Sequence, residues 1–409
     1  MKDTKDIINV FSEIGELKKV LIHTPGNELK YVSPYRLDEL LFSNVLEWRE
    51  AKKEHNEFIQ KLKSEGVEPV ELTDLVAESF EESSIKVKND FIRQYLDEAT
   101  PILDGLTKQK LLPFFLDIKH STRKTIELMM SGITQKDISI SHIERELIID
   151  PMPNLYFSRD NFISIGNSVI ISNMKYKTRK RETIFTDFIF KNHPLYKKVN
   201  MAFERKDLNN QISIIEGGDV LVYSKEILII GISERTTMSA ILELAENFKK
   251  TKRSFKKIYG VEVPKMKNLM HLDTWLTMID YDKFIYSPNV LTDLKFWEIN
   301  LDYEKISSKE LHASLSEFLK LIIGKDPILI PIGGKGASQI TIDIETNFVA
   351  ANYLVIRPGV VIGYSRNYET QKALEGHGVK VIAFEGNQLS LGMGSSRCMS
   401  MPLIRSNLK

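Results

Sequence analysis

The sequence predicts an α/β fold built from repeated units, with one all-helical insertion. Beyond Asp150, four segments each contain two short apolar runs around a turn, which is the pattern of a β-hairpin. These segments are NFISIGNSVIIS, DVLVYSKEILIIG, TWLTMIDYDKFIYS and NYLVIRPGVVIGY. Helix-like sequence follows three of them closely, and the units recur at irregular intervals of roughly 55 to 80 residues. Such a recurrence indicates a closed array of α/β units.

The chain before these repeats also divides into elements. Residues 15–26 alternate apolar and polar side chains and stop at a Pro-Gly pair, as a β-strand does. Residues 33–66 are predicted to form a helix, because Ser33 can cap its start and Gly66 can end it. This strand and helix can supply a further unit of the array.

A purely helical pattern follows, with apolar residues three and four apart from about residue 75 to residue 138. It interrupts the α/β pattern and predicts a helical insertion. The expected organisation is residues 1–74 as the first part of the α/β body, 75–148 as the insertion, and 149–409 as the remainder, which ends in a loop that carries a cysteine.

Composition limits the classes of function. The net charge of +1 argues against a nucleic-acid or anionic membrane partner. The first residues contain no signal-peptide pattern, and no apolar run reaches the roughly 18 residues of a membrane span. One cysteine cannot form an intramolecular disulfide, and the 8 histidines include no HExxH pair. We therefore expect a cytoplasmic protein without a metal.

The single cysteine, Cys398, lies in the glycine-rich stretch SLGMGSSRCMSMP. A lone cysteine is more often an inert core residue than a nucleophile. This one follows Arg397 in a polar segment that can bend to present a side chain, which favours a chemical role. We assign no chemical role to Arg397 itself. A nucleophilic thiol also needs a partner that handles its proton, and histidine serves this purpose.

Three of the hairpins begin with acidic or histidine side chains. They are Ser-Arg-Asp at 158–160, Glu-Gly-Gly-Asp at 216–219 and His-Leu-Asp at 271–273. Taken singly, each has an ordinary interpretation, as a surface ion pair, a turn or a polar strand end. If the units pack around a common axis, however, equivalent strand starts converge in one pocket, and His271 and Asp273 point to the same face.

The charges of this pocket select a class of substrate. Asp160, Glu216 and Asp273 would repel an anion, whereas a guanidinium group offers forked N–H donors that carboxylates bind in pairs. Its positive charge would also help the thiol to ionise. The chemistry that follows is attack on the guanidino carbon and loss of ammonia.

The motifs PNLYFSRD, EGGDVL, GISERTT, MHLDTW and SLGMGSSRCMSMP, in this order, closely resemble those of the arginine deiminase family of guanidino-group modifying enzymes. The resemblance covers essentially the whole chain. It implies a five-bladed α/β propeller with a helical insertion, a homo-oligomer that we expect to be a dimer, and no metal or organic cofactor. The implied activity is hydrolysis of free L-arginine to L-citrulline and ammonia, the first step of arginine catabolism.

The resemblance also implies roles for individual residues. Cys398 would be the nucleophile that forms a covalent amidino intermediate, and His271 the acid and base. Asp160 and Asp273 would hold the guanidinium group, while Glu216 would orient His271. Residues implied at the other end of the substrate are Arg179 and Arg235 for the carboxylate, and Asn154 with the backbone of Phe157 for the α-amino group.

Some points stay open. Arg179 lies in a basic run, so Lys180 or Arg181 can take its place, and each arginine can instead be a solvated charge at a helix start. Family members often read LLFDDV where this chain has LLFSNV, and some carry an arginine where this chain has Met393. The alternatives are a related hydrolase acting on agmatine, methylated arginine or peptidyl arginine, and a non-catalytic arginine-binding scaffold.

Overall fold

A computed structural model describes residues 7–117, 121–138, 146–207, 209–210, 212–251, 253–263, 269–291, 294–302 and 305–408. Within these ranges, five sheets of three or more strands repeat one pattern. In each sheet the first strand runs antiparallel to the second, and the second runs parallel to the third. A helix connects the second strand to the third, as a parallel crossover requires.

The strands of these sheets have the following bounds. The first sheet contains β19 (Met401–Arg405), β1 (Leu17–Ile22) and β2 (Glu68–Glu71). The second contains β5 (Phe162–Ile165), β6 (Ser168–Ile171) and β7 (Asn200–Phe203). The third contains β8 (Val220–Val222), β9 (Ile227–Ile232), β10 (Lys257–Glu262), β13 (Lys295–Asn300) and β14 (Ser308–Leu311). The fourth contains β11 (Leu276–Met278), β12 (Lys283–Tyr286) and β15 (Ile328–Pro331). The fifth contains β16 (Leu354–Arg357), β17 (Val360–Tyr364) and β18 (Lys380–Phe384).

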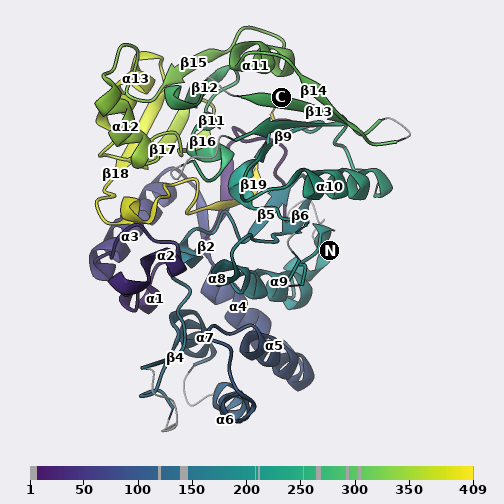
Figure 1. Cartoon of the computed structure of the whole chain (residues 1–409), viewed down its shortest axis with the longest axis vertical. Helices are drawn as coiled ribbons and strands as arrows, with labels where there is room; N and C mark the ends of the chain where they lie inside the picture. Colours follow the sequence, from purple (N-terminus) through teal and green to yellow (C-terminus); the bar gives the residue numbers. More distant parts are fainter. Residues whose placement is uncertain are drawn as a thin grey trace.

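The crossover helices lie at the periphery, and β19, β5 and β11 lie nearer the middle (Figure 1). These helices are α3 (Trp48–Ser64), α9 (Thr183–Asn192), α10 (Met238–Lys250), α11 (Leu315–Ile323) and α13 (Tyr368–Gly376). The four predicted hairpins are confirmed as β5–β6, β8–β9, β11–β12 and β16–β17. The opening strand β1 does supply a further unit, and its antiparallel partner β19 comes from the C-terminal end of the chain.

One detail of the sequence prediction is corrected. The expected single helix over 33–66 is broken, because Leu41 has a left-handed backbone with φ of +61°. The chain forms a short 3-10 turn and α2 (Leu37–Leu40) before this break, and α3 begins only at Trp48. After β12 the chain also forms β13 and β14, which extend the third sheet through β10.

Helices α4 (Leu72–Glu81), α5 (Ile85–Asp97), α6 (Gly105–Leu116) and α7 (Thr122–Ser131) lie at one end of the molecule (Figure 1). Side chains of Ser84, Asp104 and Ser121 cap the starts of α5, α6 and α7. This region shares its core with the second sheet: Phe91 of α5 stacks on Phe188 of α9, with ring centroids 4.1 Å apart. The helices are therefore packed onto the α/β body.

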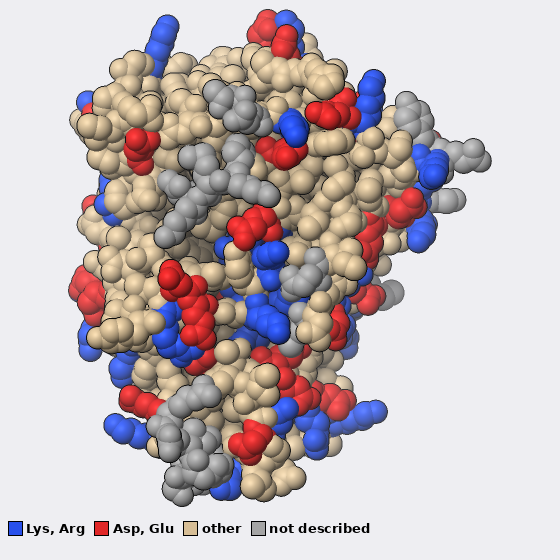
Figure 2. Space-filling view, in the orientation of Figure 1, with Lys and Arg blue, Asp and Glu red and all other residues tan. Residues whose placement is uncertain are grey.

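The remaining elements are short. They include α1 (Asn27–Lys30), α8 (Lys177–Lys180), α12 (Gln339–Asn347), β3 (Ile133–Thr134) and β4 (Leu147–Ile149). Acidic and basic side chains are interspersed on the face drawn in Figure 2, in keeping with the net charge of +1. Within the described ranges, no helix combines the length and the apolar character needed to cross a bilayer.

Candidate active site

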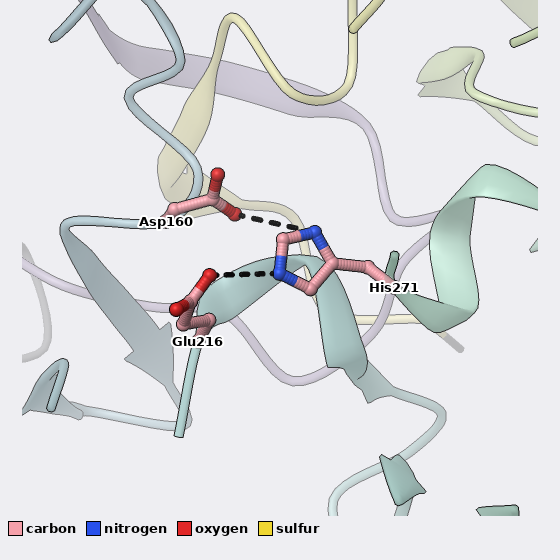
Figure 3. Close-up of side chains that lie close together, drawn as sticks. All are labelled: Asp160, Glu216 and His271. Atoms are coloured by element: carbon pink, nitrogen blue, oxygen red, sulfur yellow. Dashed lines mark hydrogen bonds and ion pairs between the residues drawn. The ribbon is translucent and has the colours of Figure 1, made fainter. Parts of the chain in front are cut away.

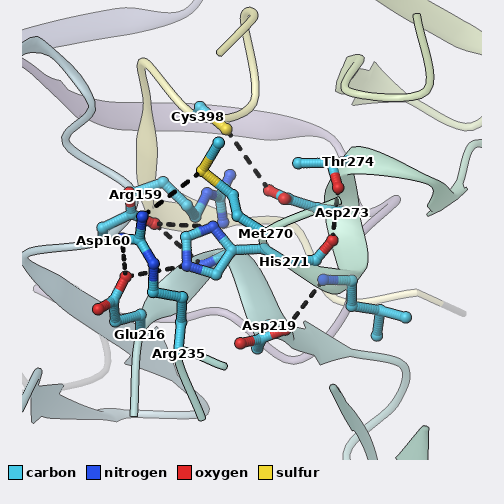
Figure 4. A network of polar contacts seen from close by, with 12 residues as sticks. Arg159, Asp160, Glu216, Asp219, Arg235, Met270, His271, Asp273, Thr274 and Cys398 are labelled. Atoms are coloured by element: carbon cyan, nitrogen blue, oxygen red, sulfur yellow. Dashed lines mark hydrogen bonds and ion pairs between the residues drawn. The ribbon is translucent and has the colours of Figure 1, made fainter. Parts of the chain in front are cut away.

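The polar residues that precede the first strands of four sheets lie together (Figure 4). Asp160 precedes β5, Glu216 precedes β8, His271 and Asp273 precede β11, and Cys398 precedes β19. A pocket lies among them, with Asp160, His271 and Cys398 in its wall. Its other lining residues are Leu41, Asn154, Phe157, Arg179, Arg235, Met270, Thr274, Gly392, Met393 and Gly394. Glu216 and Asp273 lie directly behind the wall, in contact with His271 and Cys398.

His271 is held between two carboxylates (Figure 3). Its Nε2 lies 2.9 Å from Oε2 of Glu216, and its Nδ1 lies 3.9 Å from Oδ1 of Asp160. Burial opposes its charging, but Asp160 and the hydrogen bond to Glu216 outweigh burial and raise the pKa of His271 to about 9. At neutral pH the imidazole is therefore a cation that can donate a proton.

Gly218 makes room for this ring. A Cβ atom at position 218 would lie 2.6 Å from Cγ and Nδ1 of His271. Gly218 of the EGGD motif thus lets the backbone pass close beside the imidazole. The motif therefore does more than form a turn.

Asp160, Glu216 and His271 have donor atoms within 4.8 Å of one another, a spacing that could hold a metal ion. Each carboxylate, however, already faces a guanidinium group. Arg179 Nη1 lies 2.7 Å from Asp160 Oδ2, and Arg235 Nη1 lies 3.1 Å from Glu216 Oε2. These two cations balance the carboxylates and would repel a metal ion, so the cluster suits proton transfer better than metal binding.

Cys398 is buried, with 5% of its surface exposed, and its Sγ lies 3.9 Å from Oδ2 of Asp273. Burial raises the pKa of the Cys398 thiol well above its usual value, and the charges of Asp273 and Asp160 raise it further. In this state the thiol is protonated. A cation bound between the two carboxylates would remove much of this penalty and favour the thiolate.

The three basic side chains of the run 179–181 point to different places. Arg179 lines the pocket, whereas Lys180 donates to the carbonyl oxygen of Asn210 and Arg181 donates to that of Asp150. Arg179 also pairs with Glu182, 3.0 Å away. Lining the same pocket, Asn154 donates to the carbonyl oxygen of Leu40 at 2.7 Å.

Two apolar residues that line the pocket have left-handed backbones. Leu41 and Met393 have φ of +61° and +65°, and both line the pocket. The hydroxyl of Ser43 donates to the carbonyl oxygen of Leu391, which joins the loops that carry them. The two departures noted in the sequence, LLFSNV and Met393, therefore lie on facing loops.

Sequence reasoning missed Asn352, which precedes β16 and contacts the cysteine loop. Its Oδ1 accepts hydrogen bonds from the backbone N–H groups of Cys398 at 2.9 Å and Ser395 at 3.3 Å. Its Nδ2 donates to the carbonyl oxygen of Asp273 at 3.2 Å. A signal for Asn352 exists in the sequence, because it starts the fourth hairpin just as Asp160 and Asp273 start others. Asn352 is uncharged, however, so a search for charged residues at strand starts does not find it.

Comparisons with known proteins identify the family of this chain. The sequence profile described as arginine deiminase matches residues 38–405. An arginine deiminase of Metamycoplasma arthritidis is 49% identical over 98% of both chains, and one of Metamycoplasma hominis is 48% identical over 98% of this chain and 97% of that one.

Among solved structures, SxtG, an amidinotransferase of Microseira wollei, matches 98% of both chains with a TM-score of 0.55. At 16% identity this likeness shows a shared α/β fold alone. The full-length match at nearly half identity carries the assignment. The chain belongs to the arginine deiminase family.

Proposed function

We propose that this protein is an arginine deiminase, a hydrolase that acts on the C–N bond of a linear amidine and converts free L-arginine to L-citrulline and ammonia. The observation that carries the proposal is one pocket where the only cysteine faces a cationic histidine and two carboxylates. The family assignment supports the same reaction.

Substrate binding is proposed as an exchange of charges. In this structure, Arg179 forms an ion pair with Asp160, and Arg235 forms one with Glu216. The substrate guanidinium would replace Arg179 on Asp160 and reach Asp273 as well. Arg179 and Arg235 would then turn their forks to the substrate carboxylate, with Asn154 and the Phe157 backbone at the α-amino group. Agmatine lacks that carboxylate, so it would leave both arginines without their anion.

The chemistry follows from the positions of Cys398 and His271. The bound cation favours loss of the thiol proton to solvent, and the thiolate of Cys398 attacks the guanidino carbon. His271 gives its proton to the departing nitrogen, and ammonia leaves a covalent S-alkylthiouronium group on the sulfur. Neutral His271 then accepts a proton from water as the water oxygen attacks the same carbon. Expulsion of the thiolate, with loss of one proton to solvent, releases citrulline.

The larger architecture is part of the proposal. The repeated sheet pattern, and the pairing of β1 with β19, support a five-bladed α/β propeller with a helical insertion at 75–148 between residues 1–74 and 149–409. The single cysteine supports a reducing, cytoplasmic setting. A homodimer is proposed from the family resemblance.

A colorimetric citrulline assay tests the function. Purified protein should release citrulline from arginine, and agmatine and methylated arginine should be turned over much more slowly. Cys398→Ser should fold normally and release none. Faster turnover of agmatine would favour the related hydrolase, and arginine binding without citrulline formation would favour the scaffold.

A further inference from the structure

Arg397, directly before the cysteine, bridges two carboxylates inside the protein. Its side chain is 1% exposed. Nη1 lies 2.6 Å from Oδ2 of Asp273, and Nη2 lies 3.2 Å from Oε2 of Glu13. Nη2 also donates to the carbonyl oxygen of Val220 at 3.0 Å. A buried arginine with donors satisfied on three sides has a fixed orientation, because moving it would leave charges without partners.

The contact with Arg397 gives a hydrogen-bond partner to only one of the two carboxylate oxygens of Asp273. Its Oδ2 is bound by Arg397 and lies 3.9 Å from the sulfur of Cys398. Its Oδ1 is buried and has no hydrogen-bond partner among the described residues. A buried carboxylate oxygen without a hydrogen-bond donor is unfavourable. Binding of a ligand N–H group at this oxygen would supply the missing hydrogen bond. Arg397 thus determines which oxygen stays open.

Arg397 also sets the balance of charge around the sulfur. The titratable groups that influence Cys398 include Asp273, Asp160, Tyr156 and Tyr364, with His271 in the same pocket. The charge of Arg397 lowers the pKa of the thiol, against the effect of Asp273 and Asp160.

Glu13 holds Arg397 from the side away from the pocket. Its Oε1 accepts a hydrogen bond from the backbone N–H of Val222 at 3.1 Å, which fixes the carboxylate beside β8. The segment that carries Glu13 is joined to β19 by a hydrogen bond from Asn9 N to Leu403 O, 2.9 Å long. Residues from both ends of the chain therefore support one guanidinium group.

We propose that Arg397 is a positioning residue that holds Asp273 with Oδ1 free for an N–H of the substrate guanidinium and offsets negative charge beside Cys398. This inference rests on the proposed function, and it adds a residue that acts through Asp273 without touching the substrate.

The test uses Arg397→Gln, Arg397→Lys and the control Arg405→Gln in the full-length chain. Arg405 is equally buried and lies near Glu13, but it donates to the carbonyl oxygen of Gly15 and makes no contact with Asp273. Because the chain has one cysteine, alkylation by iodoacetamide reports on Cys398 alone. The rate is measured against pH without substrate, and kcat and KM for citrulline release are measured separately.

We expect Arg397→Gln to slow alkylation at pH 7 about tenfold or more, which corresponds to a rise of one pKa unit. Its kcat/KM should fall on the order of a hundredfold, because the carboxylate that aligns the guanidinium is no longer fixed. Arg397→Lys should keep the alkylation profile of the wild type while kcat/KM still falls, since lysine retains the charge without the fork. Arg405→Gln should leave the alkylation profile unchanged.

An alkylation profile of folded Arg397→Gln that matches Arg405→Gln would overturn the inference. If Arg397→Gln does not fold, Arg397→Lys decides, and wild-type kcat/KM in that variant would overturn the positioning role. A wild-type protein that releases no citrulline refutes the proposed function instead, and the alkylation measurement stands apart from that result.

Discussion

Replacing Asn352 with alanine tests how the cysteine loop is held. The side chain is fully buried and makes three hydrogen bonds, to the backbone N–H groups of Cys398 and Ser395 and to the carbonyl oxygen of Asp273. It therefore ties the loop that carries the nucleophile to the strand start that carries the acidic partner. Alanine removes all three bonds and leaves the backbone groups buried.

The magnitude follows from these contacts. At about 1 kcal/mol of net stability for each hydrogen bond, Asn352→Ala should lower the free energy of unfolding by about 3 kcal/mol. A shift of the sulfur by about 1 Å relative to the guanidino carbon is enough to reduce kcat/KM on the order of a hundredfold. Both effects should therefore appear together.

Asn367→Ala is the matched control. Asn367 is 1% exposed, and its Nδ2 makes one hydrogen bond, to the carbonyl oxygen of Phe348 at 3.2 Å. Its loss should cost about 1 kcal/mol and leave kcat/KM near the wild-type value. Asn352→Asp keeps the accepting oxygen but loses the donor to Asp273, so it should fold better than Asn352→Ala and still turn over slowly.

Urea denaturation gives the stabilities, and the citrulline assay gives kcat and KM. If Asn352→Ala loses no more stability than Asn367→Ala and keeps wild-type kcat/KM, Asn352 does not hold the cysteine loop. Loss of stability with unchanged kinetics would show that the loop is held without Asn352.

Three further predictions concern the surroundings of the site and one remote cluster. Glu216→Gln removes a carboxylate that raises the pKa of His271. Because His271 must be protonated to act as the acid, the alkaline limb of the pH–kcat profile should move to lower pH. An unmoved limb would mean that another group determines it. Gly218→Ala places a Cβ 2.6 Å from the His271 ring and should reduce kcat/KM on the order of a hundredfold, whereas Gly105→Ala, with open space around it, should not. Buried His23 has a pKa raised to about 10, against the effect of burial, by Glu28 and Glu71. A folded pKa raised from 6.5 gives stability that is fully present below pH 6.5 and lost as pH rises through about 10. The stability advantage of wild type over His23→Gln in urea denaturation should therefore shrink between pH 7 and pH 10, and a constant difference would contradict the assignment.

The hairpins and most helices could be predicted from the sequence because their signals are local. Period-2 apolar runs around Gly-Asn or Pro-Gly turns specify β5–β6 and β16–β17 without reference to the rest of the chain. The break at Leu41 could not be predicted in this way. Its left-handed backbone is accompanied by contacts with distant residues, such as the bond from Asn154 to the carbonyl oxygen of Leu40.

In the candidate site, too, local features could be predicted from the sequence and long-range contacts could not. The chemical character of Cys398, His271 and Asp160 is visible in the sequence, as are the places of His271 and Asp160 at strand starts. Other features depend on which groups meet and on how far water is excluded from them. They are the pairing of Arg179 with Asp160, the protonated state of the thiol, and the contacts by which Asn352 and Arg397 hold the cysteine loop and Asp273. Electrostatic interactions strengthen sharply on burial, so they are decided only when strands from five sheets bring separate segments of the chain together.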